Sequence, residues 1–152
     1  MNRKLYIGFK GKNNTSSHLV NQLGKEVLLL TNSFSGLEKD ILSITESYDS
    51  IYMFGVDSSL KGTLRIEKFA EFNGITVSSV YDVAQLSKIM DGYGIVNSIS
   101  NVPTQYLCNA AYYHMLCINI NTVFIHVPSI KGMNNAFMER LQQLFRKLSQ
   151  DT

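Results

Sequence analysis

The sequence is short of cysteine, because its 152 residues contain only Cys108 and Cys117. These two cysteines lie nine positions apart within one predicted helix, which holds their side chains too far apart for a disulfide bond. A secreted scaffold built on disulfide bonds is therefore excluded, since such scaffolds depend on several cysteine pairs. We expect a cytoplasmic protein.

The sequence also lacks strong charge and long apolar runs. Its formal net charge is +2 at pH 7, and lysine and arginine are scattered rather than gathered in a basic run. A nucleic-acid partner is therefore not expected. Segment 1–14 has neither the apolar stretch of a signal peptide nor the length of a membrane span, so no membrane association is expected.

Cofactor motifs are absent as well. Segment 8–17, "GFKGKNNTSS", follows a predicted strand but lacks the spacing of a phosphate-binding P-loop. Asp57, Glu67 and His126 do not have the spacing of a zinc motif. We therefore expect neither a metal nor an organic cofactor.

The residues that are present predict a globular α/β protein, with 45% hydrophobic and 17% charged residues. Apolar segments predict strands at 4–9, 26–32, 50–55, 93–100 and 121–128, and the run at 26–32 is typical of a strand buried on both faces. Apolar residues at helical spacing predict helices within 13–24, 35–49, 81–92, 103–117 and 134–150. Segment 63–72 alternates like a strand, and 75–80 fits either a short strand or an extended link. This alternation predicts one domain, 1–152, with a three-layer α/β/α architecture around a mainly parallel sheet.

Cys108 stands near the start of a predicted helix, where free backbone N–H groups and the helix dipole favour a thiolate. The same N–H groups can stabilise an oxyanion. The alternative is that Cys108 packs in the core, as free cysteines commonly do. Cys117, between two apolar residues, is expected in the core, as are the methionines at positions 53, 90 and 115.

A thiol catalyst needs a base and a group that orients the base. His126 ends an apolar strand and so lies where sites form in such sheets. His18 belongs to a polar helix and is expected in solvent, and His114 lies on the far side of the helix that carries Cys108. Glu67, within an alternating segment, is a candidate orienting group, although an exposed edge strand explains it equally well.

Four segments together resemble one known family. "QYLCNAAYY" (105–113) and "FIHVPS" (124–129) resemble the cysteine and histidine motifs of the pyroglutamyl peptidases, also named pyrrolidone carboxyl peptidases. "IEKFA" (66–70) is similar to the segment with that family's catalytic glutamate, and "YIGF" (6–9) to its opening strand. The order glutamate, cysteine, histidine agrees too.

The resemblance implies an α/β/α cysteine peptidase that needs no cofactor and removes an N-terminal pyroglutamyl residue from peptides. It implies that Cys108 is the nucleophile, that His126 is the general base and later acid, and that Glu67 orients His126.

The chain departs from the family in the segments that bind substrate. Of the family's opening aromatic pair only Phe9 remains, and "GVDSSLK" (55–61) replaces a loop rich in glycine and glutamine. In that loop Lys61 takes the place of an arginine if one residue is inserted, and Asp57 brings a carboxylate to a pocket for a neutral lactam. Close to Cys108, Tyr106 either packs its helix against the sheet or lines the pocket. The resemblance therefore implies retained thiol chemistry with altered specificity.

Two classes of function follow from the sequence. The first is a cysteine hydrolase that acts on a small peptide or another blocked N-terminal substrate, releasing a pyroglutamyl or related small acyl group. The second is a non-catalytic binding or interaction protein that retains the same fold. A homo-oligomer stays open in either case.

Overall fold

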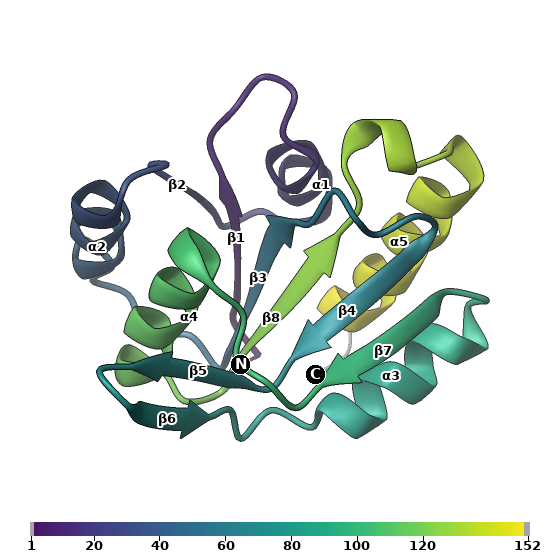
Figure 1. Ribbon diagram of the computed structural model, residues 1–152. Helices are drawn as coiled ribbons and strands as arrows, with labels where there is room; N and C mark the ends of the chain where they lie inside the picture. The colour runs from purple at the N-terminus through teal and green to yellow at the C-terminus, as the bar shows by residue number, and fades with distance from the viewer. Residues whose placement is uncertain (1, 151–152) are drawn as a thin grey trace.

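The computed structural model describes residues 2–150 and places a six-stranded sheet at the centre of the molecule (Figure 1). The strand order is β2-β1-β3-β8-β4-β7. In chain order these strands are β1 (Lys4–Phe9), β2 (Val27–Leu30), β3 (Ser50–Val56), β4 (Thr63–Glu67), β7 (Val96–Ser100) and β8 (Thr122–Val127). Two further strands, β5 (Phe69–Phe72) and β6 (Ile75–Ser78), form a separate antiparallel hairpin.

Helices cover both faces of the sheet, as Figure 1 shows, and so the predicted three-layer α/β/α fold is confirmed. One face packs against α1 (Thr15–Leu23), α3 (Val83–Gly92) and α5 (Asn135–Gln150). The other packs against α2 (Phe34–Leu42), α4 (Tyr106–Ile118) and the β5–β6 hairpin. The short 3₁₀ helix η1 (Ile130–Gly132) joins β8 to α5.

Apolar spacing explains how the helices attach to the sheet. In α5 the residues at helical spacing are all buried, namely Phe137, Leu141, Leu144, Phe145 and Leu148, as predicted for the core-facing side of an amphipathic helix. The three methionines expected in the core, Met53, Met90 and Met115, are also buried. Within residues 2–150 no helix has the length and apolarity needed to cross a membrane.

The strand β4 runs antiparallel to β8 and parallel to β7, whereas β2, β1, β3 and β8 are all parallel neighbours. Its register with β8 pairs Arg65 with His126, Ile66 with Ile125 and Glu67 with Phe124. Because side chains alternate across a strand, Arg65 and Glu67 share a face of the sheet while Ile66 is buried on the other. The reversed strand thus brings two charged side chains beside His126.

Three local expectations were wrong. The segment 26–32 is not buried on both faces, because β2 is the edge strand and only Leu30 of its four residues is fully buried. The segment 63–72 is not one strand: it breaks at Lys68, where the chain leaves the large sheet for the hairpin. Cys117 is exposed rather than in the core, because α4 buries only the side that meets the sheet. The open segment 75–80 contains β6.

Candidate active site

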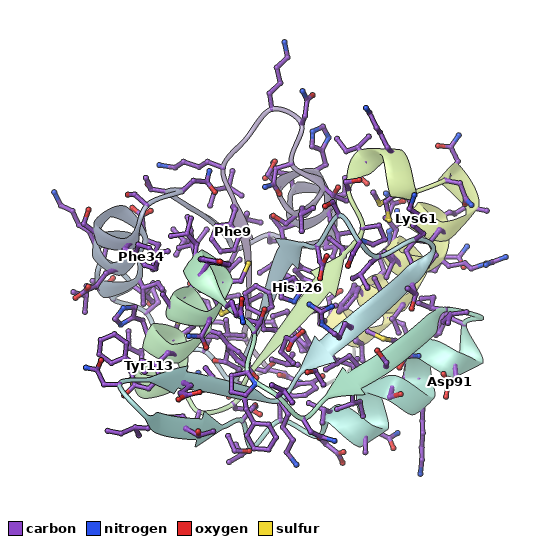
Figure 2. The ribbon with its side chains drawn as sticks, viewed as in Figure 1. Phe9, Phe34, Lys61, Asp91, Tyr113 and His126 are labelled. Atoms are coloured by element: carbon purple, nitrogen blue, oxygen red, sulfur yellow. The ribbon has the colours of Figure 1, made fainter. Side chains whose placement is uncertain are left out.

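His126 lies near the end of β8, in a row that crosses three strands. The register places it between Gly55 of β3 and Arg65 of β4. Its side chain is only 4% exposed, and its ring lies 4.9 Å from that of Phe124, measured between ring centroids. Figure 2 shows His126 over the middle of the sheet. The strands β3 and β4 thus flank the backbone position from which the imidazole projects.

Glu67 is the hydrogen-bond partner of that imidazole. The Nδ1 atom of His126 lies 3.0 Å from Oε2 of Glu67, and the Glu67 side chain is 1% exposed. A carboxylate accepts hydrogen bonds, so Nδ1 is the donor in this contact, and a neutral ring that donates from Nδ1 has its lone pair on Nε2. The backbone carbonyl of Glu67 accepts a hydrogen bond of 2.8 Å from the Tyr112 hydroxyl of α4. The exposed edge strand considered for Glu67 is therefore wrong, since β4 lies between β8 and β7.

Arg65 joins two carboxylates at the same place. Its Nε donates to Oε2 of Glu67 at 2.6 Å, and its Nη1 lies 2.9 Å from Oδ2 of Asp57. The hydroxyl and the backbone N–H of Ser59 also donate to Asp57. These hydrogen bonds, that of the Ser59 hydroxyl foremost, lower the pKa of Asp57 to about 2. Asp57 is therefore an anion at neutral pH.

Cys108 approaches this cluster from α4. A Cβ atom built on Gly55 would lie 2.9 Å from the Cys108 Sγ and 2.6 Å from the Phe124 ring. Only glycine leaves room for the helix start to pack this closely against β3. Gly55 is also the register partner of His126, so the thiol lies beside the strand position that neighbours the imidazole.

The acidity of Cys108 differs from the prediction. Burial, followed by the negative charges of Glu67 and Asp57, raises the pKa of the Cys108 thiol to about 12, and the nearby Arg65 offsets part of this. The sequence predicted a thiolate favoured by the helix start, which was wrong in direction, because the side chain packs against Gly55 of the sheet and is largely shielded from water. The resting group is a neutral thiol.

These side chains line one cavity of about 700 Å³. Its wall includes the charged and reactive groups Asp57, Arg65, Glu67, Cys108 and His126. Apolar and polar residues complete it, namely Val56, Ser58, Ser100, Val102, Pro103, Thr104, Gln105, Tyr106 and Leu107. A volume of this size accommodates a small ligand.

The start of α4 forms the rim of the cavity. Tyr106 is 79% exposed and has a φ of 59°, a left-handed conformation that is uncommon for residues other than glycine. The N-cap residue Gln105 makes no side-chain hydrogen bond to the helix. The first N–H groups of the helix are therefore not capped by that side chain, and the residues that carry them, Tyr106 and Leu107, line the cavity.

The structure brings together five of the seven predicted site residues. Glu67, Cys108 and His126 line the cavity together with Asp57 and Tyr106. Phe9 is 4% exposed and belongs to the apolar cluster beneath α4, and it does not line the cavity.

Lys61 also lies outside the cavity lining, near the start of β4 and apart from His126 (Figure 2). The cation that lines the cavity is Arg65, two residues before Glu67. Arg65 and Gly55 were not identified from the sequence. The alternation of "TLRIE" was the available signal for Arg65, because residues two apart on a strand share a face. For Gly55 the sequence offered no signal.

The remaining histidines lie elsewhere. His18 is exposed and contacts the carbonyl of Lys12, as expected for a solvated side chain. His114 lies 3.8 Å from Glu38 on the other side of α4. Among the described residues, no group of three or more histidine, cysteine or acidic side chains could hold a metal ion.

Comparisons with known proteins give a consistent result for the fold. No protein-family model matches the chain, and no curated protein matches its sequence. Among solved structures, pyrrolidone carboxyl peptidase from Thermococcus litoralis has a TM-score of 0.74 at 17% identity, over 98% of this chain and 93% of that one. The enzyme from Thermus thermophilus gives 0.76 at 15%, over 95% and 98%, and that from Fervidobacterium islandicum gives 0.74 at 17%, over 98% and 97%. The resemblance predicted from the sequence is thus confirmed in the fold.

Proposed function

We propose that this protein is a cysteine hydrolase in which Cys108 is the nucleophile, His126 the general base and acid, and Glu67 the group that orients His126. One observation carries the proposal: a buried imidazole bonded to Glu67 shares the wall of one cavity with the Cys108 thiol. This is the arrangement of nucleophile, base and orienting group that covalent catalysis requires. The fold shared with pyrrolidone carboxyl peptidases adds support.

The first step is acyl transfer to the thiol. Because the resting thiol is neutral, its proton passes to Nε2 of His126 as Sγ attacks the substrate carbonyl carbon. The C=O double bond opens and leaves a negative charge on the oxygen. The N–H groups at the start of α4 are placed to donate to that oxygen, since they lie at the cavity rim beside Cys108.

The second step releases the two products. The intermediate collapses, the C–N bond breaks, and the departing amine takes the proton from His126, which leaves a thioester on Cys108. A water molecule then gives a proton to His126 and attacks the thioester carbonyl carbon. The C–S bond breaks, the acid is released, and the proton returns to the thiol. Throughout, Glu67 stabilises the imidazolium that forms and keeps Nδ1 protonated.

The substrate class that we propose is a peptide whose N-terminus carries a pyroglutamyl or related small acyl group. The cavity is small and mixes apolar residues with charged ones. Its two carboxylates, Asp57 and Glu67, both pair with the single guanidinium of Arg65, so each charged group of the lining has a partner. We expect Tyr106 at the rim to contact the substrate, because it is exposed and lines the entrance.

One observation favours a second candidate, a non-catalytic binding protein with this fold. The raised pKa of Cys108 describes a buried, neutral thiol, which a protein that only binds its ligand would also contain. In that case His126 and Glu67 hold the cavity in shape and Cys108 fills space beside Gly55.

Turnover of a pyroglutamyl anilide by the wild type, Cys108→Ala and His126→Ala separates the two candidates. We expect release of the free aniline by the wild type and a loss of about a thousandfold or more in kcat for either variant, as is usual when one member of a catalytic triad is removed. Cys117→Ser is the matched control, because this exposed thiol should not affect the rate. Saturable binding without turnover in the wild type would favour the binding protein instead.

A further inference from the structure

The guanidinium of Arg65 uses all three of its nitrogens within the cavity wall. Nε donates to Oε2 of Glu67, Nη1 pairs with Asp57, and Nη2 lies 3.3 Å from Nδ1 of His126. The register places Arg65 directly opposite His126 on neighbouring strands. A single planar group therefore contacts both carboxylates of the site and the imidazole.

Glu67 needs such a partner. Its carboxylate is nearly inaccessible to water, and a buried carboxylate is unfavourable unless it is paired and hydrogen-bonded. One oxygen, Oε2, takes both hydrogen bonds, 2.6 Å from Arg65 and 3.0 Å from His126. The position of this oxygen, and with it the orientation of the imidazole, depends on where Arg65 is held.

Nδ1 of His126 has two competing neighbours. If Nδ1 carries the proton, it donates to Glu67 and leaves the lone pair on Nε2. If Nη2 of Arg65 donated to Nδ1, the proton would lie on Nε2, and the ring could not accept the proton of Cys108. Asp57 affects the balance between these two contacts, because its ion pair with Nη1 and the hydrogen bond from Nε to Glu67 together fix the plane of the guanidinium.

We propose that Arg65, held by Asp57, is a positioning residue that fixes Glu67 as the acceptor of the His126 Nδ1 proton and so keeps Nε2 free to act as the base. The role in catalysis rests on the proposed function. The hydrogen bonds among Arg65, Glu67 and His126 are a property of the protein without substrate.

The His126 Nδ1–H···Glu67 hydrogen bond can be observed directly by ¹H–¹⁵N NMR of the imidazole rings. The sequence contains only three histidines, so His18→Gln and His114→Gln assign the spectrum, and those two rings serve as internal references. The readout is the protection of the His126 Nδ1 proton against exchange with water. Four variants are compared with the wild type: Arg65→Met, Arg65→Lys, Asp57→Asn and Arg3→Met.

Each variant tests one property of the Arg65 guanidinium. Arg65→Met removes both its hydrogen bonds and its charge, whereas Arg65→Lys keeps the charge but cannot span two carboxylates. Asp57→Asn keeps the acceptor for Ser59 but turns an N–H group toward Arg65. Arg3→Met is the matched control, because Arg3 also bridges two carboxylates, Glu26 and Glu46, before β1 at the opposite end of the sheet.

We expect protection of the Nδ1 proton to fall about ten- to a hundredfold in Arg65→Met, as for loss of a hydrogen bond to a charged group. Arg65→Lys and Asp57→Asn should fall in the same direction, and Arg3→Met should match the wild type. Unchanged protection in both Arg65→Met and Asp57→Asn would overturn the proposal. Full recovery in Arg65→Lys would overturn it too, because charge alone would then suffice.

The experiment is independent of turnover. A wild type that shows the protected proton but does not cleave the anilide refutes pyroglutamyl hydrolysis and leaves the role of Arg65 standing. A wild type that cleaves the anilide while Arg65→Met keeps its protected proton refutes the role of Arg65 alone. Where Arg65→Met does not fold, as judged by its amide spectrum, Asp57→Asn decides, since Asp57 lies in a partly exposed loop.

Discussion

Replacing Cys117 by serine leaves Cys108 as the single thiol, so that its reaction with iodoacetamide can be followed alone across pH. Burial and the charges of Glu67 and Asp57 raise the pKa of Cys108 to about 12, against about 8.5 for a free cysteine. At pH 7.5 these values correspond to thiolate fractions of about 3 in 100,000 and about 1 in 10. Because the thiolate is the reactive form, the folded protein should react about three thousandfold more slowly than its unfolded chain.

The pH dependence has a definite sign. The pKa of Cys108 lies above the assay range, so the alkylation rate should rise about tenfold for each pH unit from 6 to 10 and reach no plateau. The assay is mass spectrometry of the intact Cys117→Ser protein, with the same protein unfolded in urea as the control for an ordinary thiol.

Fast alkylation below pH 7, or a plateau below pH 9, would refute this reasoning. Either result would mean that an imidazolium at His126 or the start of α4 stabilises the thiolate by more than burial opposes it. His126→Ala would then identify which group is responsible, because only the first contribution depends on the imidazole. In that event the resting site would be an ion pair rather than two neutral groups.

Three further predictions concern stability. Gly55→Ala should cost about 1–3 kcal/mol in urea unfolding, because its Cβ would lie 2.9 Å from the Cys108 Sγ and overpack the helix start; a stability equal to the wild type would show that α4 can move away. Tyr112→Phe should cost about 1–3 kcal/mol in the same assay, since the buried Glu67 carbonyl loses its donor, and a change below about 0.5 kcal/mol would argue against this anchor. Asp57 has a lowered pKa of about 2, so its contribution is present above about pH 4 and is lost as the pH falls toward 2. Asp57→Asn should therefore lose less stability than the wild type between pH 4 and pH 2 in thermal melts, and equal losses would contradict the assignment.

The alternation of strands and helices could be predicted from local sequence patterns. Apolar periodicity is a local property, so β1, β3, β8 and the five helices lie within or close to their predicted ranges. The amphipathic face of α5 was readable for the same reason. The order of the glutamate, the cysteine and the histidine likewise identified candidates that the structure brings to one cavity.

The neighbours of each strand were decided only by the tertiary structure. The apolar run of β2 is typical of a central strand, yet β2 lies at the edge of the sheet, because strand order depends on how distant segments pair. Cys117 looked like a core residue from its neighbours in sequence, but which side of α4 meets the sheet is set by packing.

The site depended most strongly on tertiary structure. The reversal of β4 places Arg65 opposite His126, and no local pattern encodes whether a strand enters a sheet parallel or antiparallel. Gly55 faces Cys108 across 53 positions of the sequence, so its need for a small residue exists only in the folded chain. The acidity of Cys108 changed direction for the same reason: the helix start that favours a thiolate is a property of the sequence, whereas the burial that opposes it comes from the packing of α4 on the sheet.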